Sequence, residues 1–354
     1  MPSPSSPPAA VTLAPLPDGV PAIAHPLLDG VMPRTVEGAL ELARVLGVSG
    51  VVPGHGFTAM LWEVLASIAA DDLGTARTVE PHLDALAILD QAPEGALPAI
   101  AASEECTWGV FASEGGGTPV TAHQQDGVWH LTGTKAWCSL ASELDAALVT
   151  ATTETGAKRL FALALNSPTV SVDDAPWVAR GLSEIASGPV HFAGTEAFPV
   201  GDEGWYLSRP GFSWGGIGVA ACWYGGAVGL GRALAAAAHK PNPDRLLLMH
   251  LGAVDELLHS ARRALAEAAE LVDTGKATGA DGRLLAKRVR ATVARVCEEV
   301  ATRVGHALGP APLAKDPEYS KRVADLALYV RQHHAERDQA SLGEAVTKLE
   351  TTPW

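Results

Sequence analysis

A tryptophan and a serine stand two positions apart in Leu131–Ser139, which reads LTGTKAWCS. Side chains on a β-strand alternate between two faces, so Trp137 and Ser139 point the same way if this segment is a strand. An indole ring stacks on flat heterocycles, and a hydroxyl beside it provides a hydrogen bond. The pair predicts a site for a planar ligand, although a tryptophan in a hairpin is more often a packing residue.

A glycine-rich turn lies upstream, where Phe111–Thr118 reads FASEGGGT. Glycine has no Cβ, so backbone N–H groups in such a turn can approach a ligand closely. The alternative interpretation is a plain turn between two strands.

The third chemical feature is the histidine pair His333-His334, followed by Glu336 in RQHHAERD. A histidine with a pKa near 6.5 acts as a general base at neutral pH. A solvated helix face with local ion pairs explains the same residues equally well. Adjacent histidines on a helix diverge by about 100°, so we expect no metal site here.

The elements that must position these residues fall into three blocks. Apolar residues recur at helical spacing in the first and third blocks, whereas short Val-, Thr- and Leu-rich runs between Trp108 and Phe198 predict strands. The order of helices, strands and helices, without a G-x-G-x-x-G turn, argues against a Rossmann dehydrogenase. The predicted helices are Thr35–Leu46, Phe57–Ala70, Thr75–Leu89, Asp244–Val272, Asp281–Leu308 and Glu318–Leu342.

Composition narrows the functional classes. The 354 residues carry a formal net charge of −14, which disfavours a broad nucleic-acid footprint or adhesion to an anionic membrane. Pro210–Gly231 carries no charge, but its glycines favour a buried helix over a membrane span. The four cysteines show no C-x-x-C spacing, and the Pro- and Ser-rich N-terminus is not a secretory signal, so we expect free thiols and a cytoplasmic protein.

The motifs and their order resemble the acyl-CoA dehydrogenase family of flavoproteins. GTKAWCSLA resembles that family's G-x-K-x-W-I-T-N strand, and FASEGGG resembles its T-E-P-x-A-G-S loop. The resemblance implies an α+β fold with an N-terminal helical domain, a small central β-sheet or barrel, and a C-terminal helix bundle. The expected limits are 1–20 for a disordered tail, then 21–107, 108–209 and 210–354 for the three domains.

The resemblance further implies an FAD site between the β domain and the C-terminal bundle. Trp137 would cover the isoalloxazine ring, and Ser139 would form a hydrogen bond near the N5 or O4 atom of that ring. The other cofactor contacts expected from the resemblance are Ala112, Ser113, Gly117, Thr118, Cys138 and Arg245.

The chain departs from the family at the catalytic base. His333 stands where the family's usual Glu is expected, and the family's other Glu position falls near Gly215-Gly216. Glu336 is a fallback base. The family's Arg-x-x-x-Phe segment, which holds the pyrophosphate and adenine of FAD bound to a neighbouring subunit, has lost its phenylalanine here. His239, Lys240 and Arg245 remain as candidate phosphate partners, of which Arg245 has the best geometry because its planar guanidinium can hold two oxygens.

The implied function is α,β-dehydrogenation of an acyl thioester, as in fatty acid metabolism, with hydride passing to flavin N5. The alternatives are a flavin-dependent monooxygenase of the same fold and a non-catalytic paralogue. The expected partners are an acyl-CoA or related small substrate and an electron-accepting flavoprotein or oxygen, in a homodimer or homotetramer.

Overall fold

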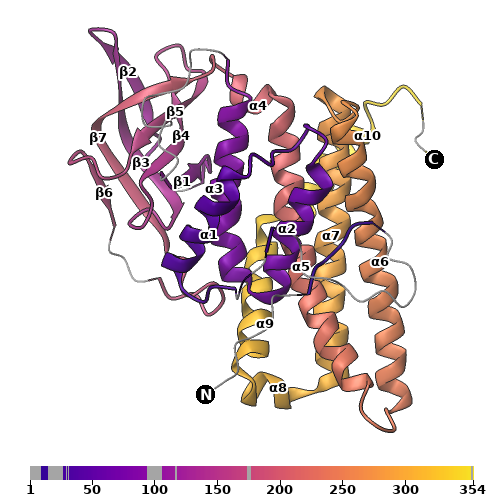
Figure 1. The fold of residues 1–354 in the computed structure, drawn as a ribbon. Helices are drawn as coiled ribbons and strands as arrows, with labels where there is room; N and C mark the ends of the chain where they lie inside the picture. The colour runs from indigo at the N-terminus through magenta and orange to yellow at the C-terminus, as the bar shows by residue number, and fades with distance from the viewer. Residues whose placement is uncertain are drawn as a thin grey trace.

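The computed structural model describes residues 9–14, 27–28, 30, 32–93, 106–115, 118–173, 177–351 and 354. Within them, three helices come first, seven strands follow, and a second set of helices completes the chain. The strands gather at one side of the molecule, and the long C-terminal helices form the other (Figure 1). This order agrees with the predicted α+β fold of helical, β and helical blocks.

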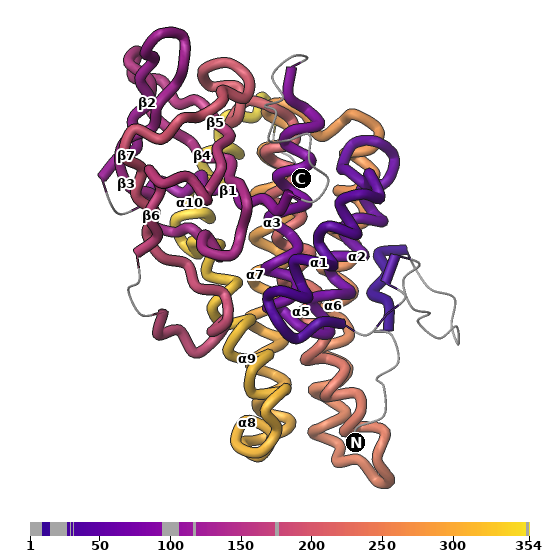
Figure 2. The backbone as a smooth tube through the Cα atoms, turned by 60° about the vertical axis from the view of Figure 1, so that its left-hand side comes forward, coloured from indigo at the N-terminus to yellow at the C-terminus, as the bar shows by residue number. Residues whose placement is uncertain are grey.

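The N-terminal helices are α1 (Val36–Val48), α2 (Thr58–Asp71) and α3 (Leu73–Asp90). Thr35 caps α1 by accepting a hydrogen bond from the Gly38 N–H, and Asp72 caps α3 through the Thr75 N–H. Both views place α3 between the strands and the other helices (Figures 1 and 2). Its apolar side packs on strand residues such as Trp108 and Leu148.

The strands close into a small barrel. Hydrogen bonds join them in the order β1-β4-β2-β3-β7-β5, and pairing of β4 with β5 closes the ring, while β6 pairs with β7. Inward-facing side chains such as Leu131, Phe161 and Phe192 fill the barrel. The strands are β1 (Trp108–Phe111), β2 (Thr121–Gln125), β3 (Val128–Ser139), β4 (Ala146–Thr152), β5 (Lys158–Ala164), β6 (Val170–Val172) and β7 (Ser187–Val200).

Helix α5 is the axis of the remaining bundle. Its apolar side chains are buried against α2, α6 and α7, as the uncharged composition of Pro210–Gly231 predicts. None of the helices in the described ranges is long and apolar enough to cross a membrane. The C-terminal elements are α4 (Trp205–Ser208), α5 (Pro210–Ala238), α6 (Arg245–Asp273), α7 (Gly279–Leu308), α8 (Pro310–Lys315), α9 (Pro317–Tyr329), the 3₁₀ turn η2 (Val330–Gln332) and α10 (Glu336–Val346).

The predicted single helix over Glu318–Leu342 is wrong. Helix α9 tightens into η2, His333 is extended at φ −89° and ψ 119°, and Ala335 has a φ of 45° before α10 begins. No glycine or proline marks this break in the sequence, so the apolar periodicity predicted a helix that continues across it. The break turns the histidine pair out of a regular helix.

An N-terminal stretch departs from the expected tail. Val11 and Leu13 are buried, and their backbone amides donate to the Ser67 hydroxyl and the Glu63 carboxylate of α2. The tail expected for 1–20 therefore does not hold for residues 9–14, and 1–8 and 15–20 lie outside the described residues.

Candidate functional site

The first candidate site is a cavity of about 590 Å³, here called the Trp137 pocket. The Trp137 indole is 58% exposed on its wall, although large aromatic side chains usually avoid water. Strand β3, the loop before β7, α3 and the α9–η2 junction all contribute to the lining. The lining includes Arg77, Ser113, Trp137, Ser139, Trp177, Ser187, Tyr329, Arg331, Gln332 and His334.

A hydrogen-bond network fixes Ser139 in this pocket. The Arg77 guanidinium of α3 donates to the Ser139 hydroxyl at 2.9 Å. The hydroxyls of Ser139 and Ser187 lie 2.7 Å apart, and the Ser187 hydroxyl also donates to the Ile185 carbonyl. The network orients Ser139 beside the exposed indole.

Lys135 anchors the glycine-rich loop. Its ammonium is buried and donates to the Ser113 carbonyl at 3.2 Å, the Glu114 carboxylate at 3.0 Å and the Thr150 hydroxyl at 2.8 Å. Burial lowers the pKa of Lys135, while its hydrogen bond to Glu114 acts in the opposite direction. The ammonium holds the loop against the barrel at the pocket's edge.

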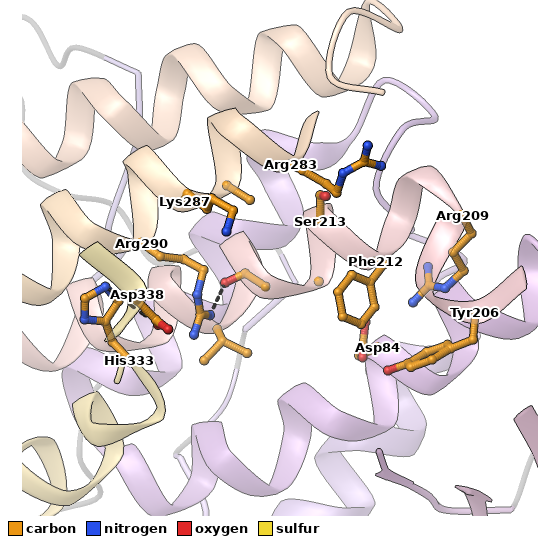
Figure 3. Close-up of a pocket in the computed structure, with 14 residues that line it drawn as sticks. Asp84, Tyr206, Arg209, Phe212, Ser213, Arg283, Lys287, Arg290, His333 and Asp338 are labelled. Carbon is orange, nitrogen blue, oxygen red and sulfur yellow. Dashed lines mark hydrogen bonds and ion pairs between the residues drawn. The ribbon is translucent and has the colours of Figure 1, made fainter. Parts of the chain in front are cut away.

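The second candidate site is a cavity of about 470 Å³, here called the His333 pocket. Figure 3 shows His333, Asp338 and Arg290 at one end and Arg209 and Tyr206 at the other. Its walls come from α3, the start of α5, α7 and α10. The lining is Asp84, Tyr206, Arg209, Phe212, Ser213, Gly215, Gly216, Val219, Arg283, Ala286, Lys287, Arg290, His333 and Asp338.

The His333 imidazole is positioned to exchange protons in this pocket. It is buried, and its Nε2 has no hydrogen-bond partner among the described residues. Burial lowers the pKa of His333, so the ring is neutral at pH 7, and Asp338 Oδ2 lies 3.9 Å from Nε2. Gly215 and Gly216, the family's other base position, line the same pocket. Neither position that the resemblance marks for a catalytic carboxylate holds one, and the carboxylates that line this cavity are those of Asp84 and Asp338.

The two pockets adjoin through Arg290. Its guanidinium donates to the Gly216 carbonyl at 2.6 Å and to the Gln332 carbonyl at 3.1 Å. Gln332 lines the Trp137 pocket, whereas Gly216 and Arg290 line the His333 pocket. Arg290 therefore links the two linings, and the adjacent histidines line different pockets, His334 the Trp137 pocket and His333 the His333 pocket.

The remaining predicted residues that the structure describes lie outside both linings. Cys138 points into the barrel core, and its thiol donates to the Lys135 carbonyl at 3.5 Å. Ala112 packs near α3, and Thr118 is exposed. Gly117 lies outside the described residues, and Glu336 and Arg245 are exposed first residues of α10 and α6.

Several site residues were not predicted. Arg77, Ser187 and Trp177 join the Trp137 pocket, and Arg290 and Asp338 frame His333. A sequence signal existed for Arg77, because Arg77–Leu89 also resembles a helix in the first domain of the acyl-CoA dehydrogenase family, with the pattern R…E-x-H…A. The others are brought in by chain segments far away in sequence.

A cluster of three carboxylates has the spacing of a cation site. Asp72, Glu184 and Asp325 place one oxygen each within 4.8 Å of the others. The Lys321 ammonium lies 3.0, 2.8 and 2.6 Å from these three carboxylates. An internal ion-pair network thus supplies the positive charge.

Comparison with known proteins supports the fold. No protein-family model matches the chain, and no curated protein matches it. Among solved structures, TdsC from Paenibacillus sp. in complex with FMN and indole superposes with a TM-score of 0.76 at 18% identity, covering 90% of this chain and 92% of that one.

Two further structures agree. Butyryl-CoA dehydrogenase from Megasphaera elsdenii has a TM-score of 0.76 at 16% identity, covering 88% of this chain and 90% of that one. KijD3 in complex with FMN and a dTDP-linked sugar has a TM-score of 0.76 at 16% identity, covering 90% and 88%. The helical, barrel and bundle arrangement of this chain is therefore the acyl-CoA dehydrogenase fold.

Proposed function

We propose that the protein is a flavin-dependent oxidoreductase that holds the isoalloxazine ring in the Trp137 pocket and an organic substrate in the His333 pocket. The observation that carries the proposal is the exposed Trp137 indole on a concave wall, next to the oriented Ser139 hydroxyl. An exposed indole beside a fixed polar group fits a planar ring with polar edges.

The chain's own residues have separable roles in this proposal. Trp137 contacts the ring face, and Ser139, held by Arg77 and Ser187, hydrogen-bonds to its polar edge. A bound flavin supplies the acceptor for a hydride or for electrons.

His333 supplies the proton chemistry in the proposal. The neutral imidazole accepts a proton from the substrate at Nε2, the atom that lacks a partner. Asp338, 3.9 Å away, stabilises the imidazolium that results. This step suits α,β-dehydrogenation of an acyl thioester, which we propose as the reaction.

A monooxygenase is the second candidate function. The observation that favours it is the absence of a carboxylate at both His333 and Gly215-Gly216. One structure of TdsC describes it as a dibenzothiophene monooxygenase. Oxygen would then replace an electron-accepting flavoprotein as the oxidant, and fast reoxidation of the reduced protein by oxygen would favour this candidate.

The cofactor form is part of the proposal. FAD is the form that the resemblance predicts, with Arg245 as a phosphate partner, yet Arg245 is exposed and outside both linings. The pocket argument concerns the ring that FAD and FMN share. A homo-oligomer that completes the phosphate site is the proposed assembly, and titration with each flavin decides between the two forms.

The test is flavin binding followed by absorbance and tryptophan fluorescence. We expect Trp137→Ala to weaken flavin affinity at least 10-fold, because the stacking surface is lost. Trp354→Ala is the matched control, since Trp354 is 89% exposed at the chain end. A folded Trp137→Ala variant with unchanged affinity, or a wild-type protein that stays colourless in excess flavin, would overturn the proposal.

The flavin absorption spectrum also tests the substrate class. Acyl-CoA thioesters added without oxygen should bleach the flavin band if the dehydrogenation proposal is right. A band that no acyl-CoA changes would exclude that reaction and leave the monooxygenase candidate.

A further inference from the structure

The His333 pocket is positively charged in a negatively charged protein. Its lining includes the cations Arg209, Arg283, Lys287 and Arg290, but only the carboxylates Asp84 and Asp338. The whole chain carries a formal net charge of −14, so an excess of cations around one cavity is a local feature.

Two of the four cations are balanced within the pocket. The charge of Arg209 acts on Asp84 and lowers the pKa of that carboxyl against the larger, opposing effect of burial. Arg290 interacts with Asp338, and its guanidinium is committed to the carbonyls of Gly216 and Gln332. These two arginines are part of the protein's own structure.

The other two cations are unbalanced. Neither Arg283 nor Lys287 forms an ion pair with a carboxylate among the described residues, and Lys287 donates only to the Ser341 hydroxyl there. The two lie four residues apart on α7, which places them on one helix face, and Figure 3 shows both side chains along the same wall. Together they form a cationic edge, defined as Arg283 and Lys287.

A deeper polar atom also lacks a partner. Arg209 is 5% exposed, and its Nε has no hydrogen-bond partner among the described residues although the side chain lines the cavity. A buried donor without a partner is destabilising, and an acceptor on a bound ligand would satisfy it. Phe212 and Val219 provide apolar wall between the polar groups.

We propose that the His333 pocket binds a small organic anion whose carboxylate or phosphoryl group is held by the cationic edge and whose apolar part contacts Phe212 and Val219. The inference deepens the proposed function, on which it rests, because it places this anionic group on the part of the substrate that lies beside His333. It requires a charged group on the part of the substrate that enters the pocket.

The test compares charged and uncharged probes by isothermal titration at pH 7.5, with the flavin-loaded protein and separately with the flavin-free protein. The probes are 4-phenylbutanoate, the uncharged 4-phenylbutanamide, phenyl phosphate and coenzyme A. We expect one of the two small anions to bind at least 10-fold more tightly than the amide. A preference for phenyl phosphate would assign a phosphoryl group, and a preference for the butanoate a carboxylate.

Charge-removing variants locate the binding. Lys287→Met and Arg283→Gln should each weaken binding of the preferred anion at least 5-fold and leave the amide unchanged. Arg295→Gln is the control, since Arg295 is an exposed arginine of α7 that lines neither pocket. Stronger salt dependence for the anion than for the amide is also expected.

Three results would overturn the inference. They are equal affinity for anion and amide, anion affinity that both variants retain, and binding of coenzyme A alone while neither small anion binds below about 10 mM. Failure of the proposed function is read separately, as loss of flavin binding in the wild-type protein, because the probe titration also runs on flavin-free protein.

Discussion

Glu80 is a buried carboxyl on α3, the helix that contributes to the linings of both pockets. On α3, Arg77 faces the Trp137 pocket and Asp84 faces the His333 pocket, and Glu80 lies between them with an oxygen 4.0 Å from Arg77. Burial raises the pKa of Glu80 to about 7, against the opposing effect of Arg77. The folded protein therefore holds a proton on Glu80 at a pH where the unfolded chain does not.

This shift predicts a pH-dependent stability. The folded pKa of about 7 exceeds the 4.5 of a glutamate side chain in water, so the contribution of Glu80 to stability is fully present below pH 4.5 and is lost as pH rises through 7. Relative to wild type, Glu80→Gln should gain up to about 3 kcal/mol in unfolding free energy between pH 5 and pH 8. Urea unfolding at both pH values measures it, with the exposed Glu336→Gln as control. The same difference at both pH values would contradict the assignment.

His333 is the residue on which the proposed chemistry depends. His333→Gln should lower kcat at least 100-fold with flavin affinity unchanged, because glutamine cannot accept the proton. In the wild type, kcat/KM should fall only below pH 6.5, since burial lowers the pKa of His333. His259→Gln, an exposed histidine of α6, is the control. Full activity of His333→Gln, with loss in Glu336→Gln, would transfer the role to Glu336.

At the residue scale, the local sequence pattern predicted which side chains share one face of a strand, but not which residues from other elements contact them. Period-two alternation placed Trp137 and Ser139 on one face, and both line one pocket. Arg77, which is 62 positions from Ser139, reaches it only through the packing of α3 on the barrel. The family resemblance marks Arg77, but its pairing with Ser139 is set by this packing and cannot be read from a single sequence.

At the scale of elements, α5 depends on close approach to α2. A Cβ built on Gly225 would lie 2.2 Å from the Ala66 carbonyl oxygen, so any side chain there forces the two helices apart. The sequence predicted α5 as a buried helix from its missing charges. Which glycine makes the contact is set by the crossing of the helices, and that crossing was not predictable from composition.

Gly225→Ala should therefore destabilise the protein by about 3 kcal/mol or more, as overpacking against backbone does. Gly218→Ala is a matched control in the same helix, because its Cβ would meet Trp62 Nε1 at an ordinary 3.5 Å. Thermal unfolding of both variants measures the difference. Equal stability of the two would show that α2 and α5 separate without cost.

At the scale of the whole molecule, residues 9–14 tie three helices together. Arg232 of α5 donates to the carbonyls of Ala9 and Ala10, and Arg262 of α6 donates to the carbonyl of Leu13. The Leu13 amide in turn donates a hydrogen bond to the Glu63 carboxylate of α2. The Pro and Ser residues of the N-terminal sequence MPSPSSPPAA predicted a disordered tail over residues 1–20. The buried Val11 and Leu13 show that two apolar residues suffice to dock it.

Leu13→Ala tests this docking. Leu13 is 1% exposed, and truncating a buried leucine typically costs about 2–5 kcal/mol. We expect a cost near the lower limit, because a terminal segment can relax around the cavity. Urea unfolding measures it, and Thr12→Ala in the same stretch is the control; a loss below 0.5 kcal/mol would mean that the segment adds nothing to the fold.

The four cysteines give each part of the molecule its own reporter of opening. All are free and buried, with Cys138 in the barrel, Cys222 and Cys297 in the bundle, and Cys106 where α3 meets the strands. Burial raises the pKa of the thiols of Cys106 and Cys138 to about 11 and about 12, so an alkylating reagent meets no thiolate in the folded state. The order in which the four become modified during brief denaturation would record which layer of the protein comes apart first.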